Sequence, residues 1–260
     1  MRNLLILSFT ILIFASCARL PMYQAKVKPT TKDTSLLRYY DSESRVLFDV
    51  YEDDQNIYIK LQTSYYYSQV KILKLGLTIW LDQKAKKSKD IGVIFPQENL
   101  SQMHNMQSGG RSNGMSGQLI MTQLHNQYLL SAKYMMLIGM DGEDRQKEIF
   151  SNLEQSDIKI TITFDSLHRL NYHSVIPKNK IFTEDKYRNK EFSIGIISGY
   201  QKVDFNQMNQ GQSGQGGGKG RGGMGSGHKG GQGRSQAPST QQRKALTEPI
   251  EFWFGVKLSK

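Results

Sequence analysis

The chain has 260 residues, and its 34 Lys and Arg against 23 Asp and Glu give it a formal net charge of +11 at pH 7. A single cysteine excludes a disulfide-stapled scaffold. A hydrophobic content of 38% excludes both a protein with many membrane spans and a chain that is disordered throughout. Since all-β domains often run to about 200–250 residues, we expect one main folded domain.

The first residues have the order of a secretion signal. A basic start at Arg2 precedes an apolar run over residues 4–14, and two small residues follow it. The run is too short to cross a membrane as a helix, which takes about 20 apolar residues. Residues 1–16 therefore predict a signal peptide that is removed on export.

The only cysteine, Cys17, lies directly after this run. The segment Ile13-Phe14-Ala15-Ser16-Cys17 resembles the lipobox of bacterial lipoproteins, with Phe14 where leucine is commonest. The resemblance implies a diacylglycerol on the sulfur of Cys17 and hence a membrane anchor. The alternative is an ordinary signal peptide whose cysteine is incidental.

Residues 17–36 lack a sustained period, and we interpret them as the tether between the lipid anchor and the domain. Known bacterial signals for export to the cell surface have an acidic cluster just after the anchor cysteine. In this chain Cys17 is followed instead by Ala18, Arg19 and Leu20. We therefore expect a lipid-anchored protein of the cell envelope, on the outer membrane and facing the periplasm.

Period-two alternation of apolar and polar residues dominates the rest of the chain, which is typical of strands with one buried face. The predicted strands are 45–51, 57–62, 73–82, 90–95, 127–138, 158–164, 171–176, 192–198 and 250–258. Such a series favours an all-β fold, an antiparallel β-sandwich of the jelly-roll or immunoglobulin-like kind, over residues 37–260.

Two glycine-rich stretches, 101–117 and 206–245, break the alternation. The second holds more than half of the 24 glycines and no acidic residue. Because such a composition does not repay its ordering entropy, both are predicted to be disordered loops. The strand at 250–258 follows the second loop, so we expect an insertion within the domain rather than a tail.

Several predicted strands and turns resemble the family 9 carbohydrate-binding modules and the DOMON-like β-sandwiches. The resemblance is carried by the segments Asp53-Asp54-Gln55-Asn56-Ile57-Tyr58-Ile59, Gly76-Leu77-Thr78-Ile79-Trp80-Leu81-Asp82 and Gly92-Val93-Ile94-Phe95-Pro96. It implies a β-sandwich. Members of these families bind sugars, haem or no known ligand, so the resemblance supports the fold more than a function.

The candidate ligand-binding residues are aromatic side chains on the polar sides of their strands. Trp80 is in line with Asp82, Trp253 with Glu251, and Tyr58 with Lys60. Aromatic faces stack on sugar rings while carboxylates accept hydroxyl hydrogen bonds, which predicts glycan binding. The alternative is that another part of the chain covers these rings, because a large apolar surface favours burial.

A third aromatic feature is the run Tyr65-Tyr66-Tyr67. Three adjacent side chains cannot share one face of a strand, so at least one tyrosine is expected to be exposed.

Patterns for catalysis, metal binding and nucleic-acid binding are weak. The match Gly110-Arg111-Ser112-Asn113-Gly114 has neither the strand before it nor the helix after it that a nucleophile elbow requires. The histidines lack zinc spacing, so we expect no metal and no cofactor. The basic loop 206–245 has no aromatic residue to stack bases, and an exported chain meets little nucleic acid.

These expectations combine into one function. The sequence predicts an exported, lipid-anchored, noncatalytic binding module of the cell envelope whose ligand is a glycan or an anionic envelope polymer. The alternative is a structural or assembly lipoprotein that engages an envelope protein through a sheet edge or the cationic loop. An enzyme is not expected.

Overall fold

The computed structural model describes residues 19–28, 36–97, 125–126, 134–140, 147–150, 157–182, 190–199 and 247–259. The described residues up to Gly199 and those from Ile250 onward belong to one compact unit. The predicted signal peptide, Cys17 and the predicted loops 101–117 and 206–245 lie outside the described residues.

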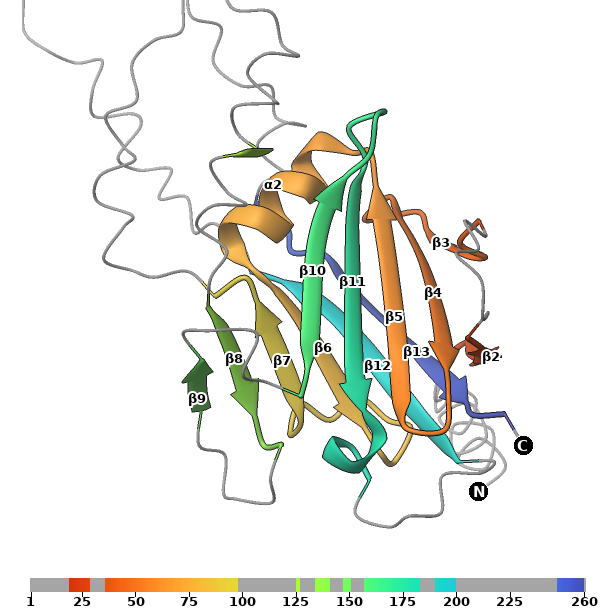
Figure 1. Ribbon diagram of the computed structural model, residues 1–260. Helices are drawn as coiled ribbons and strands as arrows, with labels where there is room; N and C mark the ends of the chain where they lie inside the picture. The colour runs from red at the N-terminus through yellow and green to blue at the C-terminus, as the bar shows by residue number, and fades with distance from the viewer. Residues whose placement is uncertain are drawn as a thin grey trace, which may run out of the picture. The chain divides into compact units, whose positions relative to one another are not determined.

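Two β-sheets make up the unit (Figure 1). Sheet A contains, in spatial order, β1 (Met22–Gln24), β13 (Glu251–Lys257), β12 (Glu191–Ser198), β6 (Leu77–Asp82), β7 (Gly92–Phe95), β8 (Met135–Ile138) and β9 (Lys147–Phe150). Sheet B contains β10 (Lys159–Phe164), β11 (Leu170–Pro177), β5 (Asn56–Thr63), β4 (Val46–Glu52) and β2 (Lys26–Val27), and β3 (Tyr39–Asp41) also pairs with β4. The helices are α2 (Tyr66–Leu75) and the short 3-10 helix η4 (Lys178–Lys180).

The predicted all-β sandwich is confirmed, because the two sheets pack their apolar faces together. On β5 the buried residues Ile57, Ile59 and Leu61 alternate with outward polar ones, as the period-two pattern requires. Phe48 of sheet B packs on Phe254 of sheet A, with ring centroids 4.6 Å apart. Each such side chain contributes about 1.5–3 kcal/mol by leaving water.

The sheets are mixed rather than wholly antiparallel. The pairs β1–β13 and β2–β4 are parallel, and the other pairs are antiparallel. Both parallel strands come from residues 22–27, which were predicted to be part of a tether. Strands of three and two residues are too short to produce a visible period, which is why the sequence did not indicate them.

The segment 22–27 joins the edges of the two sheets. It pairs with sheet A through β1 and with sheet B through β2, and Ala25 between them is buried. The ring of Tyr23 lies 4.0 Å from that of Tyr39 and 5.7 Å from that of Phe254, measured between centroids. The segment therefore forms part of the sandwich and not a separate linker.

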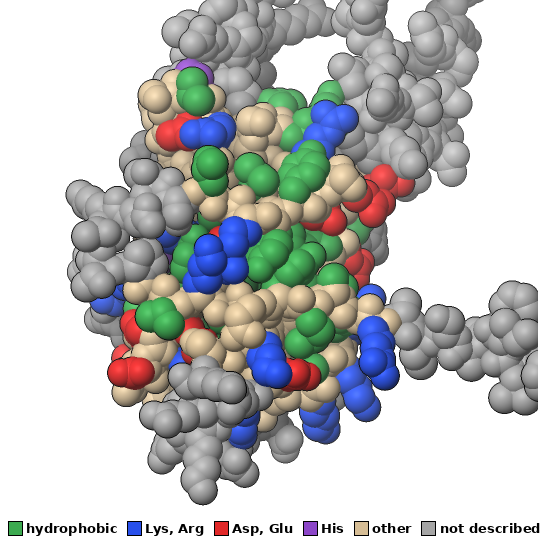
Figure 2. Space-filling model, turned by 90° about the vertical axis from the view of Figure 1, so that its right-hand side faces the viewer, with side chains coloured by type: hydrophobic (Ala, Val, Ile, Leu, Met, Phe, Trp, Pro, Cys, Tyr) green, Lys and Arg blue, Asp and Glu red, His purple; other side chains and the backbone are tan. Residues whose placement is uncertain are grey.

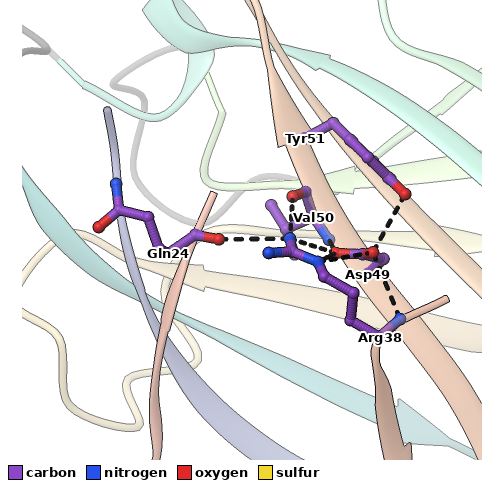
Figure 3. Close-up of polar contacts among 5 residues, drawn as sticks. All are labelled: Gln24, Arg38, Asp49, Val50 and Tyr51. Carbon is purple, nitrogen blue, oxygen red and sulfur yellow. Dashed lines mark hydrogen bonds and ion pairs between the residues drawn. The ribbon is translucent and has the colours of Figure 1, made fainter. Parts of the chain in front are cut away.

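A buried ion pair fastens the strands at this edge (Figure 3). Arg38 Nε lies 2.9 Å from each carboxylate oxygen of Asp49. The same guanidinium donates to the carbonyl oxygens of Gln24 and Val50, both at 3.3 Å. Asp49 also accepts from the Tyr51 hydroxyl at 3.0 Å, so its carboxylate is well supplied with donors.

The prediction of one continuous strand over residues 73–82 is wrong at its start, because this range contains the end of a helix followed by a strand. Leu73 and Leu75 belong to α2, and the strand β6 begins only at Leu77. Gly76 separates them with a φ of 76°, and a Cβ there would lie 2.6 Å from the Pro96 carbonyl oxygen. The spacing of the leucines imitated a strand, whereas the glycine marks the end of the helix. Among the described residues no helix is long and apolar enough to cross a membrane.

Candidate functional site

The two tryptophans lie on the outer face of sheet A in one row. Gly195 of β12 pairs with Trp80 of β6 on one side and with Trp253 of β13 on the other. A Cβ on Gly195 would lie 2.5 Å from atoms of the Trp253 indole. The Trp253 ring therefore rests on the glycine, and only 8% of the residue is exposed.

Trp80 is arranged in the same way on the next strand. A Cβ on Gly92 of β7 would lie 2.6 Å from its ring, and the indole stays half-buried. Asp82, two residues along the same face, is buried and serves the turn that follows β6. Its carboxylate accepts from the backbone amides of Lys84 and Lys86, both at 2.9 Å. These hydrogen bonds occupy the oxygens that were predicted to meet sugar hydroxyls.

Tyr58 lies on the outer face of the other sheet. It is only 6% exposed, and its hydroxyl donates to Asp53. The structure thus brings Trp80, Trp253 and Asp82 together but leaves Tyr58 on the far side of the sandwich. Most of this predicted set is covered, with Trp80 the least so.

A pocket of about 440 Å³ opens instead at the end of sheet B near the start of α2. The residues lining it include two tyrosines, two arginines and an amide: Tyr40, Tyr65, Arg45, Arg169 and Gln62. They come from β3, the turn before β4, the end of β5, the residue before α2, and the turn between β10 and β11. The pocket exists because β3, β4, β5 and β11 are neighbours in the sheet, although their residues are far apart in sequence.

Arg45 is held in place by backbone geometry and by an aromatic contact. Its φ of 55° is unusual for a residue with a side chain, which marks a conformation that the surroundings impose. Thr63 Oγ1 donates to the Arg45 carbonyl oxygen at 2.9 Å, and the Tyr65 amide donates to Thr63 Oγ1 at 3.0 Å. The guanidinium carbon lies 4.4 Å from the Tyr65 ring centroid, a cation–π contact.

Arg169 and Gln62 are also positioned by hydrogen bonds. Arg169 Nε lies 2.7 Å from Asp165, and Gln62 Nε2 donates to Asn171 Oδ1 at 2.7 Å. The Asn171 amide in turn donates to the Arg169 carbonyl at 3.2 Å. Burial raises the pKa of Asp165, but hydrogen bonds from Arg169 and Leu167 outweigh this effect and lower it, so the carboxylate remains charged beside the arginine.

The pocket is suited to holding an anion that carries a ring. Aromatic faces lie beside the Arg45 guanidinium, which has no carboxylate partner among the described residues, and the described lining residues include neither a carboxylate nor an imidazole. Within the described part of the chain, no group of three or more His, Cys, Asp or Glu residues is placed to hold a metal. The arrangement offers recognition chemistry, namely stacking, ion pairing and amide hydrogen bonds.

Sequence reasoning missed both arginines of the pocket. Arg45 and Arg169 are isolated cations in turns, and only the fold brings them together. The tyrosine run gave the one usable signal, since Tyr65 lines the pocket and Tyr66 is 42% exposed. The prediction of at least one exposed tyrosine is therefore confirmed.

No protein-family model matches the chain, and no curated protein matches it. The resemblance to family 9 carbohydrate-binding modules and DOMON-like sandwiches stays a prediction.

Proposed function

We propose that this chain is a lipid-anchored, noncatalytic binding module of the cell envelope, and that its ligand is a glycan carrying negative charge. The anchor is Cys17, and the glycan occupies the pocket of Arg45, Arg169, Tyr40 and Tyr65. The observation that carries the proposal is the Arg45 guanidinium, which stacks on Tyr65 at the pocket and, among the described residues, forms no ion pair.

Each group in the pocket matches one feature of an acidic sugar. A guanidinium binds a carboxylate or sulfate with two parallel hydrogen bonds, which gives both affinity and orientation. The tyrosine faces pack on the C–H groups of the ring. Gln62 supplies an amide that hydrogen-bonds hydroxyl groups. The net charge of +11 favours encounter with an acidic polymer.

Isothermal titration of the purified protein with a galacturonate oligomer and with its neutral galactose counterpart tests the proposal. The acidic oligomer should bind and the neutral one should not. Arg45→Gln should weaken binding by at least about tenfold, since a hydrogen bond to a charged group contributes about 1.5–3 kcal/mol. The matched control is Lys87→Gln, which removes one exposed cation from the turn after β6. Equal losses in both variants would refute specific binding at the pocket.

A second candidate function is assembly with an envelope protein. Hydrophobic side chains are exposed along the edge formed by the N-terminal strands: Met22 is 48%, Val27 69% and Leu36 88% exposed. Figure 2 looks onto this edge of the unit and shows hydrophobic side chains gathered beside Lys and Arg. Cross-linking in intact cells tests this function. A partner that is lost in Val27→Ser and Leu36→Ser but retained in Arg45→Gln would favour assembly.

A further inference from the structure

A second cationic cluster lies on the same outer face of sheet B, further along β5 from the pocket. Lys60 of β5 pairs with His173 of β11, and Tyr58 pairs with Tyr51 of β4. Lys60 Nζ lies 4.9 Å from the Tyr51 ring centroid, and Lys28 Nζ lies 4.2 Å from that of Tyr58. Two ammonium groups are thus held above a floor of tyrosine rings.

The neighbouring carboxylates, Asp49 and Asp53, form hydrogen bonds with groups other than these two lysines. Asp49, which pairs with Lys60 across the strands, is bound to Arg38 by two hydrogen bonds of 2.9 Å. Asp53 accepts from the Tyr58 hydroxyl and from the backbone amides of residues 55 and 56. Among the described residues, neither Lys28 nor Lys60 forms an ion pair. The two ammonium groups therefore lie near Asp49 and Asp53 without an ion pair to either carboxylate.

The imidazole of His173 completes the cluster. Its ring stacks toward Tyr58, with centroids 6.1 Å apart and planes at 18°. Its Nε2 is shielded from solvent and has no hydrogen-bond partner in the part of the chain that the structure describes, which is rare for a buried polar atom in a folded protein. Burial lowers the pKa of His173, and the charges of Lys60 and Lys28 lower it further. Burial and the two neighbouring cations thus both disfavour the charged form of the ring.

We propose that Lys28, Lys60 and His173 form an anion-binding subsite, and that the ligand of this module is a chain of repeated negative charges that follows β5 from the pocket to this subsite. The second part rests on the proposed function. Gln62 at the pocket and Tyr58 at the subsite are four residues apart on one face, which is about 13 Å at the rise of an extended strand. The amides of Gln62 and Asn171 lie on the same face between the two cationic groups.

NMR titration of the His173 ring against pH, with and without inorganic phosphate, tests the subsite alone. Bound phosphate reverses the sign of the field at the ring, so the midpoint of the His173 titration should rise. The rise should be lost in Lys28→Gln and Lys60→Gln and kept in the control Lys87→Gln. A midpoint that phosphate leaves unchanged, or a rise that survives the loss of both lysines, would overturn the proposal.

Chain length tests the extended ligand. A galacturonate oligomer should bind about tenfold more tightly than the monomer, because the second contact becomes intramolecular. Lys60→Gln should remove this advantage of the oligomer, whereas Arg45→Gln should weaken the binding of both the monomer and the oligomer. Equal affinities for monomer and oligomer would overturn the extended path but leave the pocket in place. A phosphate effect at His173 together with no effect of Arg45→Gln would support the subsite and refute the pocket.

Discussion

Arg38 and Asp49 form a two-pronged ion pair in which the carboxylate side chain is 0% exposed and the guanidinium side chain 22% exposed. Arg38 precedes β3, Asp49 belongs to β4, and the guanidinium also reaches the carbonyl of Gln24 in β1. One side chain thus connects three segments at the edge where sheet A and sheet B meet. The Arg38 guanidinium thus takes the place of water around the buried Asp49 carboxylate of β4.

Arg38→Met should destabilise the protein strongly. The substitution keeps most of the aliphatic volume but leaves the Asp49 carboxylate buried without a cation, which costs about 3–5 kcal/mol. Urea unfolding measures the loss. The double variant Arg38→Met, Asp49→Leu should recover much of it, since apolar groups can replace a buried pair. A single variant within about 0.5 kcal/mol of the wild type would show that the pair has no such role.

A second buried pair, Glu52 and Lys178, should matter far more than a surface pair of the same type. Lys178 Nζ lies 2.7 Å from Glu52 with both side chains almost fully buried, and the Ser259 hydroxyl donates to the same carboxylate at 2.6 Å. Glu52→Ala removes the carboxylate from this buried pair and should cost about 3–5 kcal/mol in the free energy of unfolding.

The matched control is the exposed pair of Lys257 and Glu191, which lie 3.7 Å apart with side chains 48% and 52% exposed. Because solvent screens such a pair, Glu191→Ala should cost less than about 1 kcal/mol. Chemical denaturation of both variants gives the comparison. Similar losses would mean that burial of the Glu52 pair does not set its importance.

The strands could be predicted because apolar and polar residues alternate along them, and the apolar residues are those on the buried face. All nine predicted segments contain a strand, since one face of each must be apolar to fill the space between the sheets. The exceptions are local. The segment 22–27 and the strands β3 and β9 each span too few positions to show a period, and the leucines of α2 have the spacing of a strand before β6 begins.

The pocket and the lysine cluster could not be predicted, because their residues meet only through strand order. Arg45 and Arg169 are more than a hundred positions apart in the chain, and Lys60 meets His173 only because β5 pairs with β11. Sequence reasoning instead selected the tryptophans for their chemistry. Their burial depends on Gly195 and Gly92 of neighbouring strands, which a single strand does not reveal.

Mild acid should destabilise the protein through two histidines. Burial, followed by the charges of Lys60 and Lys28, lowers the pKa of His173 below 6.5, and burial followed by His168 does the same for His125. The unfolded chain then binds more protons than the folded one below about pH 6.5, so stability is full above that pH and falls as the pH drops through it.

Unfolding in urea at a series of pH values between about 7.5 and 5 measures how the free energy of unfolding changes with pH, that is, its slope against pH. This range lies above the pH at which ordinary carboxylates titrate. His173→Phe and His125→Phe should each flatten the slope. A slope that is the same in both variants and in the wild type would show that neither ring is responsible.

Gly195→Ala should displace Trp253 from its place on the sheet. The new methyl group would lie 2.5 Å from two carbon atoms of the indole, closer than such atoms approach in proteins, so the ring must move. Overpacking of this kind costs about 1–3 kcal/mol, and the displaced indole should emit at longer wavelength as it meets water.

Trp253→Leu removes the indole that the new methyl group would meet, so adding Gly195→Ala to that variant should cost little. The double-mutant cycle should thus give a coupling above about 0.5 kcal/mol. Additive effects, or an unchanged emission spectrum in Gly195→Ala, would mean that the glycine does not determine where the indole lies.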